Sequence, residues 1–195
     1  MNIKKSGLLI CITILTLEPV TRAQVYELSP AGSKVIITGT SSLHDWEMDV
    51  KHFTSSFQLD HEGLSVKNIR KVIFNCKAHD IKSDNSLMDK KTYDALKADE
   101  FPEISFSGTT VSDLISEGTS IKGNLKGTLS LAGQKHEITI PFKGTLKDRI
   151  VDISASAELT FSGYGMQPPT AMLGTLKTGD KVKVNFTLQY NQKDI

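Results

Sequence analysis

Apolar and polar residues alternate along most of this chain. The longest run lies at 151–161, where the odd positions are apolar and the even positions between them are polar. The same period of two recurs, over shorter or longer stretches, at 53–59, 72–78, 104–106, 125–146 and 182–190. Successive side chains on a strand point to opposite faces, so each segment has one apolar and one polar face. The pattern predicts about eight or nine half-buried antiparallel strands.

The segment 123–146 has the pattern of a β-hairpin. Its first arm carries leucines at odd positions, and its second arm carries isoleucine, phenylalanine or leucine at even positions. A two-residue turn at Gly133–Gln134 places Leu129 opposite Ile138 and aligns the two apolar faces. A slip of one residue would separate those faces. We therefore expect this register.

A chain of one-sided strands must hide its apolar faces, either by stacking two sheets or by rolling one sheet into a barrel. The strand expected at 149–161 is about 40 Å long at ~3.3 Å per residue. Long, sequential strands favour the rolled sheet, because closure removes exposed edges. About eight strands enclose a lumen that side chains nearly fill or that holds one narrow ligand. Four glycines on the inward face either leave room in the lumen or mark bends: Gly108, Gly123, Gly127 and Gly144.

One segment, 86–98, has helical spacing instead. We expect Ser86 to cap this helix, with Asp89 three residues further on. Pro102 prevents a longer helix. The apolar edge consists of Leu87, Met88, Tyr93 and Leu96. A single helix that joins two strands of a meander covers one open end of a barrel, or else plugs a solid core.

Residues 1–23 have the features of a secretory signal peptide, which leaves 24–195 as the mature domain. Lys4 and Lys5 precede an apolar run, and Ala23 is a small residue at the expected cleavage site. The run has about half of the ~20 residues that a membrane span needs. An uncleaved anchor is the alternative. We expect a periplasmic or secreted protein whose mature form has no membrane-spanning segment.

Charge and cysteine content narrow the range of partners. The chain has 23 basic and 22 acidic residues, and residues 1–23 include three of the former and one of the latter. Cleavage therefore leaves 20 basic and 21 acidic residues, a net charge of −1. This balance argues against nucleic acid or an anionic membrane as the main partner. Cys76 is the one cysteine left, so the mature chain has no internal disulfide. Its place in an apolar stripe indicates a small buried hydrophobe.

Four stretches of the chain resemble a known family. They are Leu43–Trp46 (LHDW), 88–106 (MDKKTYDALKADEFPEISF), 127–141 (GTLSLAGQKHEITIP) and 168–182 (PPTAMLGTLKTGDKV). The chain is similar in these stretches to the YceI-like domain family, exported lipid- or polyisoprenoid-binding barrels of bacteria. The resemblance covers nearly all of the mature chain. It implies an all-β fold, an extended lipocalin-like antiparallel β-barrel of about eight strands with one short helix covering an end. It also implies a long apolar tunnel that holds an isoprenoid chain or a similar amphiphile.

The inward residues of the strands are the expected tunnel wall. They are Phe57, Phe74, Phe106, Leu129, Ile140, Phe142, Leu159, Phe161 and Phe186. Leu87 and Met88 of the helix are expected to contact the ligand as well. Met88, Met166, Met172 and Leu173 form an adaptable rim, since methionine fits irregular shapes. The long, apolar loop at 163–174 is the expected entrance. The alternatives are a solid core and a packed connector.

The sequence contains no HExxH, GxSxG or paired CxxC motif. We expect no catalytic residue, no metal site and no cofactor, apart from a bound isoprenoid or acyl lipid. His136, near the expected rim, is the one titratable residue placed to bond a ligand head group. Two other functions stay open: a ligand-free barrel that acts as an envelope scaffold or interaction protein, and a hydrolase built on the long loop. The sequence also leaves open whether the protein is a homodimer.

Overall fold

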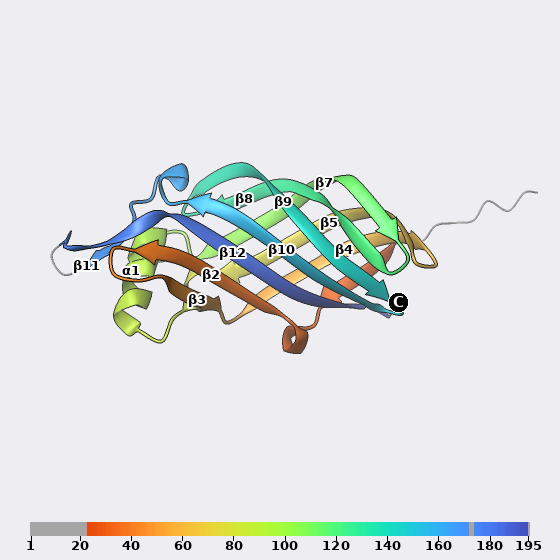
Figure 1. Ribbon diagram of the computed structural model, residues 1–195, viewed down its shortest axis with the longest axis horizontal. Coiled ribbons are helices and arrows are strands. Elements are labelled where there is room, and N and C mark those ends of the chain that lie inside the picture. Colours follow the sequence, from red (N-terminus) through yellow and green to blue (C-terminus); the bar gives the residue numbers. More distant parts are fainter. Residues whose placement is uncertain (1–22, 172–173, 195) are drawn as a thin grey trace, which may run out of the picture.

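Strands make up most of the regular structure of this chain (Figure 1). The structure, a computed structural model, describes residues 23–171 and 174–194. The strands are β1 (Gln24–Leu28), β2 (Lys34–Ser41), β3 (Trp46–Val50), β4 (Phe53–Glu62), β5 (Ser65–Lys77), β6 (Ile81–Lys82), β7 (Glu103–Glu117), β8 (Ser120–Leu131), β9 (Gln134–Lys147), β10 (Ile150–Thr160), β11 (Thr170–Ala171) and β12 (Leu176–Gln192). The helix is α1 (Ser86–Leu96), and short 3-10 turns are η1 (Pro30–Gly32), η2 (Ala78–Asp80) and η3 (Ser162–Tyr164). In this described part, no helix combines the length and the apolar composition needed to cross a membrane.

The antiparallel sheet closes into a barrel because β1 pairs with β4 on one side and with β12 on the other. Between these strands the order is β4-β5-β7-β8-β9-β10-β12, and β12 also pairs with β2. Three staves of the barrel each consist of two consecutive strands, namely β1 with β2, β3 with β4, and β5 with β6. The described strands therefore form a closed barrel of eight staves, with β11 as a short addition to β12. The predicted all-β antiparallel barrel is confirmed.

The two ends of the barrel carry different connections (Figure 1). At one end, the helix end, lie α1, the turn between β8 and β9, and the long connection from β10 to β12. At the other end, the hairpin end, lie the tight turns after β4, β7 and β9, together with both ends of the described chain. Only the helix end therefore carries segments long enough to cover or uncover an opening.

The β8–β9 hairpin turns one residue earlier than the sequence predicts. Its two turn residues are Ala132 and Gly133, so that Leu129 lies opposite His136 and not opposite Ile138. Both turn residues have positive φ, 49° and 77°, which is typical of a type I′ turn. The predicted Gly133–Gln134 turn is wrong. Residues with a Cβ rarely adopt a positive φ, but Ala132 does so here, and the turn therefore begins at Ala132 and not at Gly133. The register moves by two residues, so the apolar faces still coincide.

Aromatic rings lie over two glycines of the barrel wall. A Cβ added to Gly127 would lie 2.4 Å from Cζ of Phe106, and one added to Gly39 would lie 2.3 Å from Cζ2 of Trp46. The sequence left open whether Gly127 makes room in the lumen or marks a bend. In the structure a neighbouring ring takes up the room that this glycine leaves, an arrangement that covers a glycine in a sheet with an aromatic side chain.

The helix α1 begins with a different cap from the one predicted. The side-chain oxygen of Asn85 accepts hydrogen bonds from the amides of Leu87 and Met88, at 3.0 and 3.2 Å. Asn85 is thus the N-cap, and the prediction of Ser86 is wrong by one residue, since both residue types cap helices well. At the other end Lys97 has φ 52° and stops the helix, two residues short of the predicted boundary at 98.

Side chains fill the hairpin end of the barrel. Tyr26, Leu59, Leu146 and Val151 are almost completely buried there and come from β1, β4, β9 and β10. Each of the aliphatic side chains, Leu59, Leu146 and Val151, contributes about 1.5–3 kcal/mol to stability through its burial. Tyr26 belongs to β1, which the alternation pattern did not reveal. The filled hairpin end confines any empty space to the middle and the helix end of the barrel.

Candidate functional site

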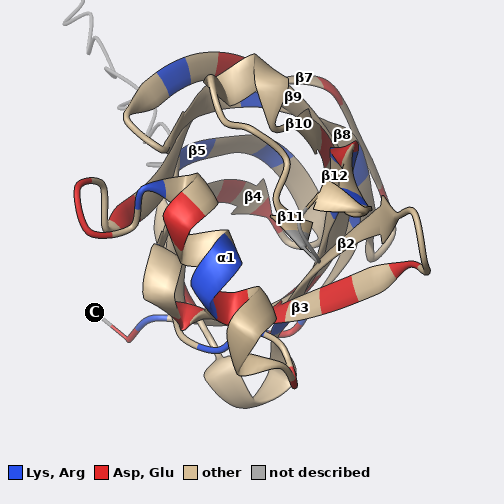
Figure 2. Ribbon diagram, turned by 90° about the vertical axis from the view of Figure 1, so that its left-hand side faces the viewer, with Lys and Arg blue, Asp and Glu red and all other residues tan. Residues whose placement is uncertain are grey.

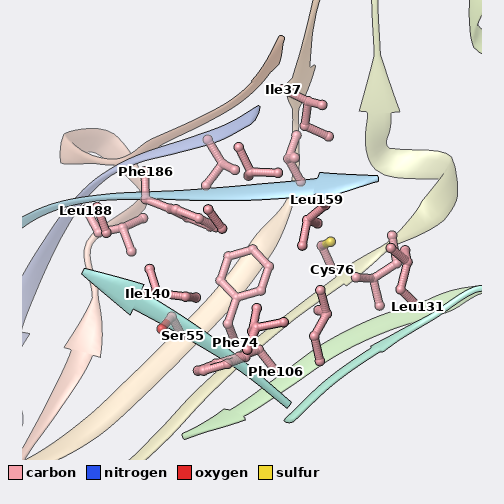
Figure 3. Close-up of a pocket in the computed structure, with 18 of the residues that line it drawn as sticks. Ile37, Ser55, Phe74, Cys76, Phe106, Leu131, Ile140, Leu159, Phe186 and Leu188 are labelled. Atoms are coloured by element: carbon pink, nitrogen blue, oxygen red, sulfur yellow. The ribbon is translucent and has the colours of Figure 1, made fainter. Parts of the chain in front are cut away.

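An apolar cavity of about 230 Å³ lies inside the barrel (Figure 3). Strands β2 to β10, β12 and the helix α1 all contribute side chains to its wall. The fully buried side chains Tyr26, Leu59, Leu146 and Val151 are not part of that wall. The cavity is therefore a chamber enclosed by the barrel and separate from the filled hairpin end.

Most residues predicted to contact a ligand lie in this wall. They are Phe57, Phe74, Phe106, Leu129, Ile140, Phe142, Leu159, Phe161, Met166 and Phe186. Leu87 and Met88 do not line the cavity: Leu87 is 59% exposed, and Met88 packs against the core elsewhere. The helix contributes Thr92 and Leu96 instead, one turn apart on its inward side. Met172 and Leu173 lie outside the described residues. Contact between the wall and a ligand stays a prediction.

Other wall residues were not predicted from the sequence. Trp46, Met48 and Val50 alternate with acidic residues along β3 and face the cavity, a period-two signal that the predicted strands did not include. Ser55 is a polar residue on the inward face of β4, where the period of two places it, but no sequence pattern indicates that it faces a cavity. Tyr190 ends an inward stripe that the sequence does show, although nothing in that stripe indicates a partner for its hydroxyl.

No charged residue is found in the wall among the described residues that line the cavity. The polar groups in the wall belong to Trp46, Ser55, Thr92, Thr160 and Tyr190. Each makes a hydrogen bond within the protein; for example, Nε1 of Trp46 donates to the carbonyl of Thr40 at 3.0 Å. A water molecule is poorly stabilised in such a space, because it needs several polar groups that are free to form hydrogen bonds with it. The cavity therefore suits an apolar molecule.

An aromatic cluster closes the cavity toward the hairpin end. The rings of Tyr26 and Phe57 stack at 5.3 Å, and Tyr190 meets Phe57 edge-on at 4.8 Å. The hydroxyl oxygens of Tyr190 and Ser55 are 2.9 Å apart. Burial raises the pKa of Tyr190 to about 12, so its phenol stays protonated at neutral pH. The deep part of the cavity thus contains one neutral pair of hydroxyl groups.

The helix α1 lies across the other end of the cavity, in front of the ring of strands (Figure 2). Thr92 and Leu96 on its inner face line the cavity. The hydroxyl of Tyr93 ties the helix to the barrel by sharing its one hydrogen between the carbonyls of His79 and Ile81, at 3.2 and 3.0 Å. The prediction that one helix covers an end of the barrel is confirmed. Side-chain contacts, including the hydroxyls of Tyr93 and Thr92, hold this helix against the barrel.

The connection from β10 to β12 forms the rest of the helix-end wall. Phe161 and Met166 reach the cavity from this connection. Asp180 anchors its first turn, because the amide and the hydroxyl of Ser162 both donate to its carboxylate, at 2.8 and 2.6 Å. The hydroxyl of Ser162, followed by its amide, lowers the pKa of Asp180 below the ordinary value. The predicted entrance loop therefore starts from a fixed, charge-assisted anchor.

Cys76 lines the cavity and is buried, as its place in an apolar stripe predicted. Burial, with smaller contributions from Asp80 and Glu103, raises the pKa of its thiol to about 12. A protonated thiol is a poor nucleophile and a poor metal ligand. This cysteine therefore acts as part of the apolar wall.

His136, the titratable residue singled out in the sequence, lies outside the cavity, as do His52 and Asp80. His136 is exposed, and its ring packs edge-on against Tyr164 at 4.8 Å. Nδ1 of His52 and Oδ1 of Asp80 are 3.0 Å apart on the surface. Within residues 23–171 and 174–194, no group of three or more His, Cys, Asp or Glu could hold a metal ion. None of these groups borders the cavity.

Solved structures of bacterial proteins share this fold. BcnA of Burkholderia cenocepacia matches with a TM-score of 0.66 and 15% identity, over 83% of this chain and 98% of that one. A polyisoprenoid binding domain from Saccharophagus degradans matches with a TM-score of 0.67 and 11% identity, over 88% of this chain and 100% of that one. The YCEI protein of Campylobacter jejuni matches with a TM-score of 0.60 and 16% identity, over 97% and 94%. At these identities the likeness is one of fold.

A comparison with family models gives a match by sequence. The model of the YceI-like domain covers residues 26–190, which is nearly the whole described chain. No curated protein matches the chain.

Proposed function

The chain belongs to the YceI-like domain family, and on that basis we propose that it is an exported lipid-binding protein. One polyisoprenoid, or a similar long-chain amphiphile, occupies the barrel cavity. The observation that carries this proposal is the cavity wall, which is made of hydrocarbon side chains and has no charge among the described residues. The Saccharophagus degradans domain of the same fold is described as polyisoprenoid binding, which supports the same class of ligand here.

The energetics of an uncharged wall favour a long ligand. Each methylene group removed from water contributes about 0.8 kcal/mol, whereas association costs about 4–15 kcal/mol in lost freedom. The gain grows with every methylene that is buried, so a long chain can exceed that cost without any polar contact, whereas a short chain cannot. The proposed ligand is therefore long.

The size of the cavity favours a narrow ligand. Its volume of about 230 Å³ is below the ~300–1,000 Å³ of most pockets for small molecules. A flexible chain can adapt its shape to such a space. Met48 and Met166 in the wall can shift to accommodate branches along the chain, because methionine is flexible.

The ligand enters and leaves at the helix end. The hairpin end is filled by side chains, while the helix end is covered by α1 and by the β10–β12 connection. These segments can move without breaking the pairing of the barrel strands. Movement of α1 or of this connection therefore opens the cavity.

We also propose that the protein is exported and that its signal peptide is cleaved. The strand β1 begins at Gln24, directly after the expected cleavage site at Ala23, so cleavage removes none of the barrel. We expect the mature protein in the periplasm or the medium. The intact mass of protein isolated from its host tests this, since retention of residues 1–23 would contradict export with cleavage.

A substitution that fills the cavity tests lipid binding. Ala155 on β10 lines the cavity between Phe142 and Phe186 on the neighbouring strands. Ala155→Phe should weaken binding of geranylgeraniol by at least about tenfold, because the new ring takes the place of the ligand. Binding is measured by displacement of a fluorescent apolar dye from protein that organic solvent has freed of lipid.

The neighbouring Ser154 provides a matched control. It is exposed on the opposite face of the same strand, so Ser154→Phe should leave the affinity unchanged. Circular dichroism and the melting temperature of both variants establish that they are folded. Equal binding by Ala155→Phe and the wild type would show that the cavity is not the binding site. Failure of the folded wild type to bind dye or geranylgeraniol would instead favour a ligand-free scaffold.

A further inference from the structure

Two hydroxyl groups meet in the otherwise apolar wall of the cavity. Ser55 comes from β4 and Tyr190 from β12, and their side chains are 8% and 3% exposed. In Figure 3, Ser55 lies beside Ile140, on the side of the cavity away from Leu131. The remaining polar wall groups, Trp46, Thr92 and Thr160, lie at the start of β3, on α1 and at the end of β10, all at the helix end. Ser55 and Tyr190 are thus the polar groups of the deep part.

The hydrogen bonds already made by this pair determine whether it can donate to a ligand or accept from one. Oγ of Ser55 donates its hydrogen to the carbonyl oxygen of Ile73 at 2.8 Å. Ser55 can then only accept from Tyr190, whose oxygen is 2.9 Å away, so Tyr190 donates. Both hydroxyl hydrogens are used, while lone pairs remain on both oxygens. Toward the cavity the pair is therefore a hydrogen-bond acceptor.

An acceptor pair in a dry space discriminates between ligands by their polar groups. A hydroxyl on the ligand can donate to it and so recovers the hydrogen bond that it loses on leaving water. An ether, ester or ketone oxygen has no hydrogen to donate and would be buried unpaired. A charged head group would have to give up its hydration in a wall that carries no opposite charge among the described residues.

We infer that Ser55 and Tyr190 form a subsite that accepts a hydrogen bond from a hydroxyl group on the ligand, which selects neutral long-chain alcohols. This inference rests on the proposed lipid-binding function. The hydroxyl-bearing end of the ligand lies deep in the cavity, beside the Tyr26–Phe57–Tyr190 cluster, and the hydrocarbon chain extends toward α1. The subsite thus determines both the class of ligand and its direction in the barrel.

A pair of matched ligands tests the subsite. Geranylgeraniol and its O-methyl ether share one hydrocarbon chain, but only the alcohol can donate a hydrogen bond. Lipid-free wild-type protein should bind the alcohol about three- to tenfold more tightly than the ether. Tyr190→Phe keeps the ring and removes one of the two acceptor oxygens, so it should reduce this ratio by weakening alcohol binding alone. Ser55→Ala should act in the same direction.

Ser154→Ala is the control, because it removes a hydroxyl that lies on the exposed outer face of β10 and not in the cavity wall. It should leave the alcohol-to-ether ratio at the wild-type value. Melting curves show which variants fold, and Tyr190→Phe alone decides the matter if Ser55→Ala does not fold. Equal affinity of the wild type for the two ligands would overturn the subsite and leave lipid binding intact. Binding of neither ligand would overturn both proposals.

Discussion

The carboxylate of Asp180 fixes the conformation at the start of the β10–β12 connection. It accepts two hydrogen bonds from Ser162, and the backbone carbonyl of the same residue accepts one from the amide of Phe161 at 3.0 Å. The next residues then fold back, because the amides of Tyr164 and Met166 both donate to the carbonyl of Phe161. Met166 reaches the cavity from this turn. The carboxylate is thus linked to the helix-end wall by a short series of hydrogen bonds.

Acid should loosen this connection. The hydrogen bonds of Ser162 lower the pKa of Asp180, so the ionised carboxylate stabilises the folded state above its unfolded pKa, near 3.9. That contribution is lost as the pH falls through the lower, folded pKa. Amide hydrogen exchange of Tyr164 and Met166 should therefore speed up, relative to amides of the barrel strands, below about pH 4.

Asp180→Asn is the control for this prediction, because the amide keeps an acceptor oxygen but does not titrate in this range. In this variant the exchange of Tyr164 and Met166 should no longer respond to acid separately from the rest of the barrel. The same acid response in the variant and in the wild type would show that another group is responsible.

Ser55 and Tyr190 mark the limit of prediction from sequence at this scale. The period of two already places each of them on an inward face. Their contact spans 135 positions along the chain and exists because closure of the sheet brings β12 across from β4. Alternation predicts which way a side chain points, but it does not predict which distant side chain it meets.

The helix α1 is the element whose stability bears most directly on access to the cavity. It covers the helix end with Thr92 and Leu96 on its inner face. Its N-terminus depends on Asn85, which accepts from two backbone amides. Loss of this cap should fray the first turn and weaken the cover as a whole.

Asn85→Ala should lower the free energy of unfolding by about 0.5–2 kcal/mol, the usual value of a capping side chain. Ser86→Ala, which removes the cap predicted from sequence, should change it by less than about 0.5 kcal/mol. Urea denaturation of the two variants and the wild type measures both effects. A larger loss for Ser86→Ala than for Asn85→Ala would show that the cap is assigned to the wrong residue.

The β8–β9 hairpin illustrates what sequence does and does not determine for an element. Alternation identified both arms and their shared apolar face, and the structure confirms them. The register was wrong by two residues, because either register keeps that face intact. The turn conformation at Ala132 and Gly133 decides between the two registers. Alanine rarely adopts a positive φ, so the sequence did not indicate this turn.

At the scale of the whole molecule, the barrel could be predicted because one-sided strands leave few ways to bury their apolar faces. The filled hairpin end could not be, since it depends on β1, a five-residue strand that carries the buried Tyr26. Nor could the inner contacts of the helix, where Thr92 and Leu96 take the place expected for Leu87 and Met88. These features depend on how the sheet closes and on which side chains lie deep inside it, and both are properties of the assembled barrel.

The central claim is that each molecule holds one long apolar ligand inside the barrel. Native mass spectrometry of protein isolated from its host without organic solvent tests it most directly. We expect one lipid bound per chain, released by organic extraction and identified in the extract as a long-chain alcohol such as a polyisoprenoid alcohol. Protein that carries no lipid, and that also fails to take up geranylgeraniol after extraction, would contradict the claim.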